Sequence, residues 1–100
     1  MDRFVDDDAG YLAWLEAHPR GYVLNTFPHM RSAYLVLHRT TCGTLNRRLA
    51  KGREWTHLYG KACSDDHAEL VEWAFGETGR SVHGCGTCGP PVEPVMGRGG

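Results

Sequence analysis

Four cysteines carry the clearest chemistry in this chain of 100 residues. Their spacing is C-x20-C-x21-C-x2-C, and the last pair, Cys85 and Cys88, is flanked by glycines. A C-x2-C turn of this kind lets two sulfurs point at one tetrahedral centre, as in structural zinc sites. The pattern therefore predicts one structural Zn²⁺ bound by Cys42, Cys63, Cys85 and Cys88.

Two histidines are alternatives to one of these thiolates. His38 lies four residues before Cys42, and His83 lies two residues before Cys85. Cys63 is the ligand most open to replacement, because a buried cysteine at the end of a strand is ordinarily a small hydrophobe. A plainer interpretation is two structural thiols beside an unrelated C-x2-C pair. Thiol–disulfide exchange is disfavoured, since a Gly-Pro-Pro sequence rather than a helix follows the pair.

A basic segment separates acidic ends, although the net charge of the chain is only -1. Residues 39–61 hold six basic side chains and one acid, a local charge of +5. The aromatic and histidine side chains of the same stretch would alternate along one strand face, a combination that nucleic-acid surfaces use. The predicted binding residues are Arg39, Arg47, Arg48, Lys51, Arg53, Trp55, His57, Tyr59 and Lys61. The alternatives are a solvated charged segment and aromatic rings that pack beneath it.

The six histidines also raise the question of catalysis. Only His38 and His57 are predicted to have neighbours that could take part in catalysis. They would lie on neighbouring strands near Arg39 and Lys61, and this group of side chains would suit cleavage of a phosphodiester. Glu54 is the one acid nearby. A histidine that donates to a backbone carbonyl or supports a zinc site is the simpler interpretation. No residue is therefore predicted to be catalytic.

Periodicity indicates the elements that must position these residues. Apolar side chains recur at helical spacing near residues 6–18 and 65–77, each time after acids suited to a helix N-terminus. β-branched and aromatic content predicts strands at residues 22–27, 34–39 and 55–63. In the second strand, alternation puts Leu35 and Leu37 on one face and Tyr34, Val36 and His38 on the other.

The predicted fold class is α+β, in the order α-β-β-β-α. Three antiparallel strands carry both helices on one face, because the apolar stripes of the helices need a common apolar surface. The stripe of the second helix contains Leu70, Val71, Ala74 and Phe75. The other face of the sheet stays free to bind, and the C-x2-C turn closes the domain. Residues 1–88 form this single domain, and the Pro/Gly-rich residues 89–100 are predicted to be disordered.

The N-terminus indicates the compartment. Residues 1–8 carry four Asp and no apolar run, which does not fit a signal peptide. No window approaches the ~18 apolar residues of a membrane span. A cytoplasmic protein is predicted, and its reducing surroundings favour zinc over disulfides.

Six short segments resemble a known family. They are FVDDDAGYL at 4–12, YLVLHR at 34–39, TC at 41–42, EWT at 54–56, KAC at 61–63 and CGTC at 85–88. Through them, residues 4–89 resemble a small uncharacterised bacterial zinc-binding domain that occurs alone or beside nuclease-type domains. The resemblance implies that the four cysteines belong together and favours nucleic acid as the partner. It implies no established activity.

The predicted function is therefore a zinc-stabilised module that binds DNA or RNA through residues 39–61. A protein-interaction or regulatory module that docks an acidic partner is the alternative. A small enzyme that cleaves phosphodiesters with His38 and His57 is the third candidate. We expect a binding module rather than an enzyme.

Overall fold

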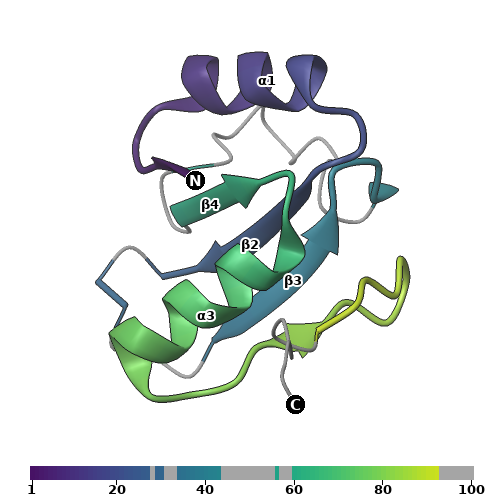
Figure 1. The fold of residues 1–100 in the computed structure, drawn as a ribbon. Coiled ribbons are helices and arrows are strands. Elements are labelled where there is room, and N and C mark those ends of the chain that lie inside the picture. Colours follow the sequence, from purple (N-terminus) through teal and green to yellow (C-terminus); the bar gives the residue numbers. More distant parts are fainter. Residues whose placement is uncertain (28, 31–33, 44–55, 57–59, 93–100) are drawn as a thin grey trace.

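A five-stranded mixed sheet forms the centre of the fold, in the order β1-β4-β2-β3-β5 (Figure 1). Its strands are β1 (Asp2–Phe4), β2 (Tyr22–Thr26), β3 (Leu35–Arg39), β4 (Gly60–Ser64) and β5 (His83–Gly84). Neighbouring strands are antiparallel except β3 and β5, which run parallel. The computed structural model describes residues 1–27, 29–30, 34–43, 56 and 60–92. The α+β class is as predicted, but the sheet has two more strands than expected and is not purely antiparallel.

Two helices pack on the sheet within the described residues, α1 (Asp8–Ala17) and α3 (His67–Thr78). Asp7 caps α1 by accepting from the Gly10 N–H at 2.9 Å, and Asp66 caps α3 by accepting from the Ala68 N–H at 3.0 Å. α3 ends at Gly79, whose φ of 71° is the left-handed conformation that glycine adopts without strain. Both helices form close to their predicted ranges.

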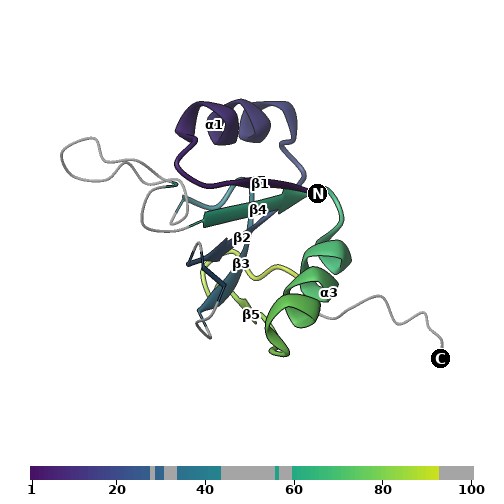
Figure 2. The same ribbon diagram turned by 90° about the vertical axis from the view of Figure 1, so that its left-hand side faces the viewer.

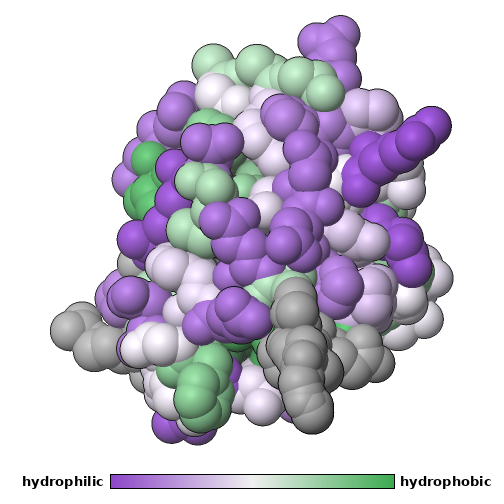
Figure 3. All heavy atoms as spheres, viewed as in Figure 1, coloured by the Kyte–Doolittle hydropathy of each residue, from purple (hydrophilic) through white to green (hydrophobic). Residues whose placement is uncertain are grey.

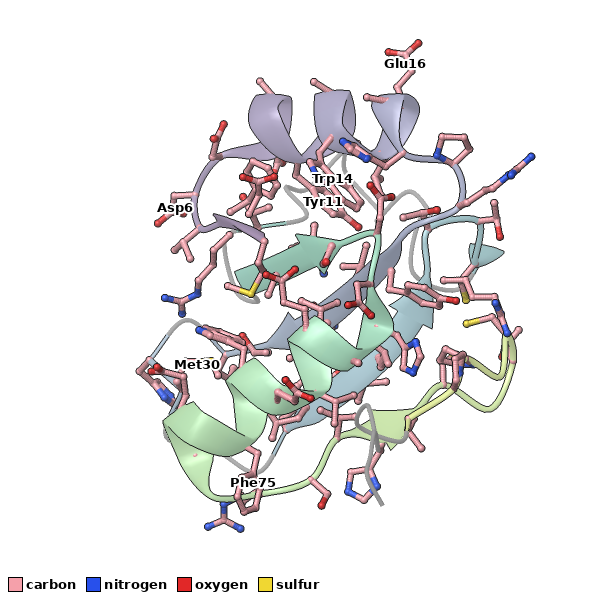
Figure 4. All side chains as sticks on the ribbon, in the orientation of Figure 1. Asp6, Tyr11, Trp14, Glu16, Met30 and Phe75 are labelled. Atoms are coloured by element: carbon pink, nitrogen blue, oxygen red, sulfur yellow. The ribbon has the colours of Figure 1, made fainter. Side chains whose placement is uncertain are left out.

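The helices lie on opposite faces of the sheet. Side chains alternate across a strand, and in β2 Val23 packs with Tyr11 and Trp14 of α1 whereas Leu24 packs with the apolar side of α3. Figure 4 shows Tyr11 and Trp14 pointing from α1 towards the sheet and Glu16 pointing away. Figure 2 shows α1 and α3 on different sides of the strands. The prediction that both helices share one face is therefore wrong, because β2 offers apolar side chains on both.

The sheet face under α1 is the one that was expected to stay free. Lys61 and Cys63 share this face, as alternation predicts, and both are buried. The Lys61 ammonium lies 5.8 Å from the centroid of the Tyr11 ring and donates to Oδ1 of Asn25. Lys61 is thus enclosed beneath α1, where a bound nucleic acid cannot reach it.

The buried ammonium of Lys61 makes stability depend on pH. Burial lowers the pKa of Lys61 to about 8, although the charges of Cys63 and Asp8 act against this. Above pH 8 the unfolded chain keeps a lysine proton that the native protein has lost, so Lys61 contributes a free energy of unfolding that rises with pH. We expect this contribution to approach about 1.4 kcal/mol per pH unit and to be absent in Lys61→Met, so it is measured as the difference between the two proteins. Urea unfolding of both proteins at pH about 8 and at pH about 9 measures this difference. If the free energy of unfolding changes by the same amount between the two pH values in both proteins, the role of Lys61 is contradicted.

The C-terminal part of the described chain packs back on the domain. Pro90 is buried, and Val92 contacts the apolar cluster beneath α3. A Cβ added to Gly84 in β5 would approach Cγ1 of Val92 to 3.0 Å, which shows how closely the two segments lie. Pro90 and Val92 therefore pack against the domain, and the boundary at residue 88 stays a prediction. The rest of the predicted tail, residues 93–100, lies outside the described residues.

One residue of the predicted α3 stripe lies on the surface. Leu70, Val71 and Ala74 are buried as expected, but Phe75 is 60% exposed and points outwards (Figure 4). The face of the molecule in Figure 3 is mostly hydrophilic, and its apolar residues form separate small patches. The described residues on this face therefore form no broad apolar docking surface.

Candidate metal centre

Four metal-ligand side chains converge beside the outer edge of β3. His38 comes from β3, Cys42 follows it, and Cys85 and Cys88 follow β5. β5 pairs in parallel with β3, and the Cys85 N–H donates to the carbonyl of Leu37 at 2.9 Å. This pairing carries the C-terminal cysteines to the strand that holds His38. We call His38, Cys42, Cys85 and Cys88 the His/Cys group.

The geometry of the His/Cys group fits a tetrahedral metal ion. One ligand atom from each residue lies within 4.8 Å of all the others, and the sulfurs of Cys42 and Cys85 are 3.8 Å apart. Two sulfurs bound at about 2.3 Å to a tetrahedral zinc ion stand about 3.8 Å from each other. Three of the residues are buried and Cys88 is half-buried, so the group can form a metal site shielded from solvent.

The state of His38 also suits a metal ligand. Its Nδ1 is buried and has no hydrogen-bond partner among the described residues, an arrangement that ordinarily costs about 1–3 kcal/mol and that a metal bound at this nitrogen would relieve. Burial, with the positive charge of Lys61 adding to it, lowers the pKa of His38 to about 4. The imidazole is therefore neutral at physiological pH, as metal binding requires.

Backbone N–H groups donate to two of the sulfurs. Thr87 donates to Sγ of Cys85 at 3.4 Å, and Arg39 donates to Sγ of Cys88 at 3.3 Å. Burial alone would raise the pKa of Cys85, but hydrogen bonds from the backbone N–H groups of Cys88 and Thr87 and from the thiols of Cys42 and Cys88 outweigh burial and lower it. Burial raises the pKa of Cys88 to about 11. A cation at the centre of the group would favour the thiolate form of each cysteine.

The side chain of Arg39 holds the cysteine turn against β3. Its Nε donates to the carbonyl of Cys88 at 3.0 Å and its Nη2 to the carbonyl of Gly89 at 3.2 Å. The guanidinium also lies over the ring of Tyr22, 5.8 Å from its centroid. Arg39, predicted to bind nucleic acid, therefore supports the His/Cys group.

Cys63 does not belong to the His/Cys group. It pairs with Val23 of β2, and Val23 pairs on its other side with His38 of β3. Cys63 and His38 thus stand in one row but two strand spacings apart, about 10 Å. Burial and the charge of Asp2 raise the pKa of Cys63 to about 12, so it behaves as a buried hydrophobe. His38, predicted as a substitute ligand, takes the fourth position, whereas the other substitute, His83, is exposed on β5.

Most of the predicted nucleic-acid surface lies outside the described residues. This holds for Arg47, Arg48, Lys51, Arg53, Trp55, His57 and Tyr59. The predicted pairing of His38 with His57 for phosphodiester chemistry also lies outside the description, because His57 is not among the described residues. His38 itself is part of the His/Cys group. Of the predicted surface residues that are described, Lys61 is buried and Arg39 contacts the cysteine turn.

The donor set indicates what the group can do chemically. One imidazole and three thiolates complete a tetrahedral shell, which leaves no position for a substrate or an activated water. Such a site would stabilise the fold by joining β3, the turn after it and the C-terminal turn.

Comparisons with known protein families, with curated proteins and with solved structures find no match for this chain. The resemblance to a small bacterial zinc-binding domain is thus supported by the His/Cys group alone, and no family is identified. Among the described residues, no helix has the length and apolar character needed to span a membrane.

Proposed function

We propose that the His/Cys group binds one structural zinc ion and that the zinc-stabilised domain is a nucleic-acid-binding module. The observation that carries the zinc site is the 3.8 Å separation of the Cys42 and Cys85 sulfurs within a shell completed by His38 and Cys88. Three thiolates with one imidazole favour zinc over hard cations such as Mg²⁺ or Ca²⁺, which prefer oxygen ligands. The purified protein should therefore contain about one zinc ion per chain.

The metal would stabilise the weakest part of the sheet. β5 has only two residues, and both are exposed. Two-residue pairing on a sheet edge contributes little by itself, so the ion supplies the main link between the C-terminal turn and β3. A domain of this size buries a small core and commonly depends on a metal for its stability.

The nucleic-acid proposal rests on how the basic residues are connected to the folded domain. Residues 44–55 hold Arg47, Arg48, Lys51 and Arg53 and the single acid Glu54. A ligand of the His/Cys group, Cys42, stands just before this segment, and a fully buried residue, Thr56, stands just after it. Both ends of the basic segment are thus attached to the fold. Attachment at both ends reduces the entropy that a loop loses when it binds phosphates.

Thr56 is an unusually well-bonded attachment point. Its N–H and its hydroxyl both donate to Oδ1 of Asp8 at 2.8 Å, and its hydroxyl accepts from the Asp7 N–H at 2.6 Å. Its carbonyl accepts from the Asp6 N–H at 2.8 Å. The loop before α1 thereby holds one end of the basic segment, and the zinc site would hold the other.

Two measurements test the proposal. Zinc content by elemental analysis tests the metal, and fluorescence anisotropy with labelled single- and double-stranded DNA and RNA tests the partner. Binding that weakens steeply with salt supports the phosphate contacts. A chain that binds none of the probes at low salt is not a nucleic-acid module, and an acidic protein partner for residues 44–55 then takes precedence.

The guanidinium of Arg39 should raise the affinity for zinc. Arg39→Ala removes two hydrogen bonds to the cysteine turn, and losses of outer contacts around metal sites weaken binding about 10- to 100-fold. Arg39→Lys should recover little of the zinc affinity that Arg39→Ala loses, because an ammonium group lacks the planar arrangement of N–H donors that reaches both carbonyls. Competition with a chelator gives the dissociation constant, and melting at saturating zinc shows whether the fold is intact. An unchanged constant in both variants would contradict this role.

A further inference from the structure

The three sulfurs of the His/Cys group differ in their access to solvent. Cys42 and Cys85 are buried, with exposed fractions of 3% and 8%. Cys88 is only half-buried, and it lies at the end of a surface turn next to Gly89. A small oxidant arriving from solvent therefore meets the sulfur of Cys88 first.

Both buried sulfurs lie close enough to react with an oxidised Cys88. All ligand atoms of the group are within 4.8 Å of one another, and a disulfide bond is about 2.05 Å long. Closing either pair thus requires a movement of less than about 3 Å. The turn that carries Cys85 and Cys88 is joined to the sheet by the two residues of β5, by the Cys85 to Leu37 hydrogen bond and by the contacts of Arg39, so a movement of this size changes a small set of local contacts.

We propose, building on the zinc site of the proposed function, that the His/Cys group is a redox switch in which a peroxide converts Cys88 and one buried cysteine into a disulfide and expels the zinc ion. The sulfur of Cys88 attacks one peroxide oxygen, the O–O bond breaks, and a sulfenic acid and a hydroxide form. The thiolate of Cys42 or Cys85 then attacks the sulfenic sulfur, forms the S–S bond and releases a second hydroxide.

Electrons and protons balance in this sequence. Each of the two sulfurs loses one electron, and the peroxide accepts both. Two protons from buffer acids in the solution convert the two hydroxides into water, so the sum is two thiolates, one peroxide and two protons giving one disulfide and two waters. Zinc would not change its oxidation state, and the one thiolate and one imidazole that remain would no longer hold it, since closed structural sites hold zinc with four protein ligands.

Loss of the ion would affect both the C-terminal turn and the basic segment, residues 44–55. The link through the metal between the C-terminal turn and His38 of β3 would be lost, and the described contacts of the turn with β3 would be the short β3–β5 pairing, the Cys85 to Leu37 hydrogen bond and the contacts of Arg39. Cys42, at one end of the basic segment, would lose its attachment to the metal. Oxidation is therefore expected to loosen residues 83–89 and to weaken nucleic-acid binding together.

The test uses the zinc-loaded wild-type protein and hydrogen peroxide. Released zinc is followed with a chromogenic chelator, and disulfides are mapped by mass spectrometry of peptides. We expect about one zinc ion released per disulfide formed, a disulfide that contains Cys88, and recovery of the zinc-bound form with dithiothreitol and added zinc. Hydrogen exchange at residues 36–40 and 83–88 should rise with zinc release. Cys63→Ala is the matched control, because Cys63 lies outside the group, and it should release zinc as the wild type does.

Two results would overturn the switch. One is zinc that stays bound after peroxide has oxidised Cys88, and the other is a disulfide that joins Cys42 to Cys85 and excludes Cys88. A chain that contains no zinc before peroxide is added gives a different answer, because it refutes the zinc site itself and the switch with it.

Discussion

Replacing Cys85 with serine should remove the zinc ion and leave the domain largely unfolded at room temperature. Structural zinc contributes roughly 10–16 kcal/mol of apparent binding free energy in zinc-finger peptides, as much as the whole stability of a typical domain. Serine cannot supply a thiolate, so most of this free energy is lost. Cys42→Ser should behave alike, because its sulfur is the other member of the 3.8 Å pair. Elemental analysis and circular-dichroism melts with and without added zinc measure both effects.

His38→Ala and Cys63→Ala are the pair that identifies the fourth ligand. His38→Ala should lose zinc, because it leaves three thiolates and an open position. Cys63→Ala should keep the full zinc content and lose only packing, on the order of 1–2 kcal/mol. The reverse outcome, with zinc kept in His38→Ala and lost in Cys63→Ala, would restore the four-thiolate site that the cysteine spacing predicts.

Neutralising the basic segment should abolish most of the affinity for nucleic acid without unfolding the domain. In Arg47→Gln/Arg48→Gln/Lys51→Gln, each lost phosphate contact is worth about tenfold at about 0.1 M salt, or about a thousandfold together. The slope of log affinity against log salt should fall by about 2.7 for duplex DNA, and equally for all sequences. Fluorescence anisotropy over a salt series gives both numbers, and a thermal melt of the same variant checks the fold.

Arg80→Gln is the control for that triple variant. Arg80 is exposed after the C-terminal end of α3 and lies outside the basic segment, so its loss removes a charge but no predicted contact. The salt slope of Arg80→Gln should match the wild type. Trp55→Ala and Tyr59→Ala then separate stacking from packing: stacking residues lose about 1–3 kcal/mol of binding per base, whereas core residues lose stability. An unchanged salt slope in the triple variant would exclude this segment as the binding surface.

The sequence by itself determined the two helices and the alternation of side chains in strand β3. Asp7, Asp66 and Gly79 mark helix ends because caps depend on a few neighbouring residues. In β3, Leu35 and Leu37 point to the side opposite Val36 and His38, as the period of two requires. These features depend on residues that are adjacent in the chain, so the pattern is sufficient to predict them.

Only the tertiary structure decided which face each helix covers. Val23 and Leu24 are adjacent and both apolar, so β2 can bury either face or both, and its composition does not distinguish these arrangements. Similarly, the apolar stripe of α1 would fit either side of the sheet. In the folded protein a helix covers each face of the sheet around β2. Lys61 is therefore buried on the face that was expected to bind nucleic acid.

The two edge strands also depended on the fold. β1 has three residues and β5 has two, too few to show any alternation. They become strands because an already formed neighbour offers unpaired backbone groups, β4 to one and β3 to the other. Sequence patterns therefore could not reveal them.

The composition of the His/Cys group follows from this strand order. The cysteine spacing was sufficient to predict a metal site, because C-x2-C with distant cysteines is a strong zinc signal. It could not choose between Cys63 and His38, since both lie on the same sheet face and both are buried. The strand order distinguishes the two residues. Because β2 lies between β4 and β3, Cys63 is held about 10 Å from His38. Because β5 pairs with the outer edge of β3, Cys85 and Cys88 lie close to His38.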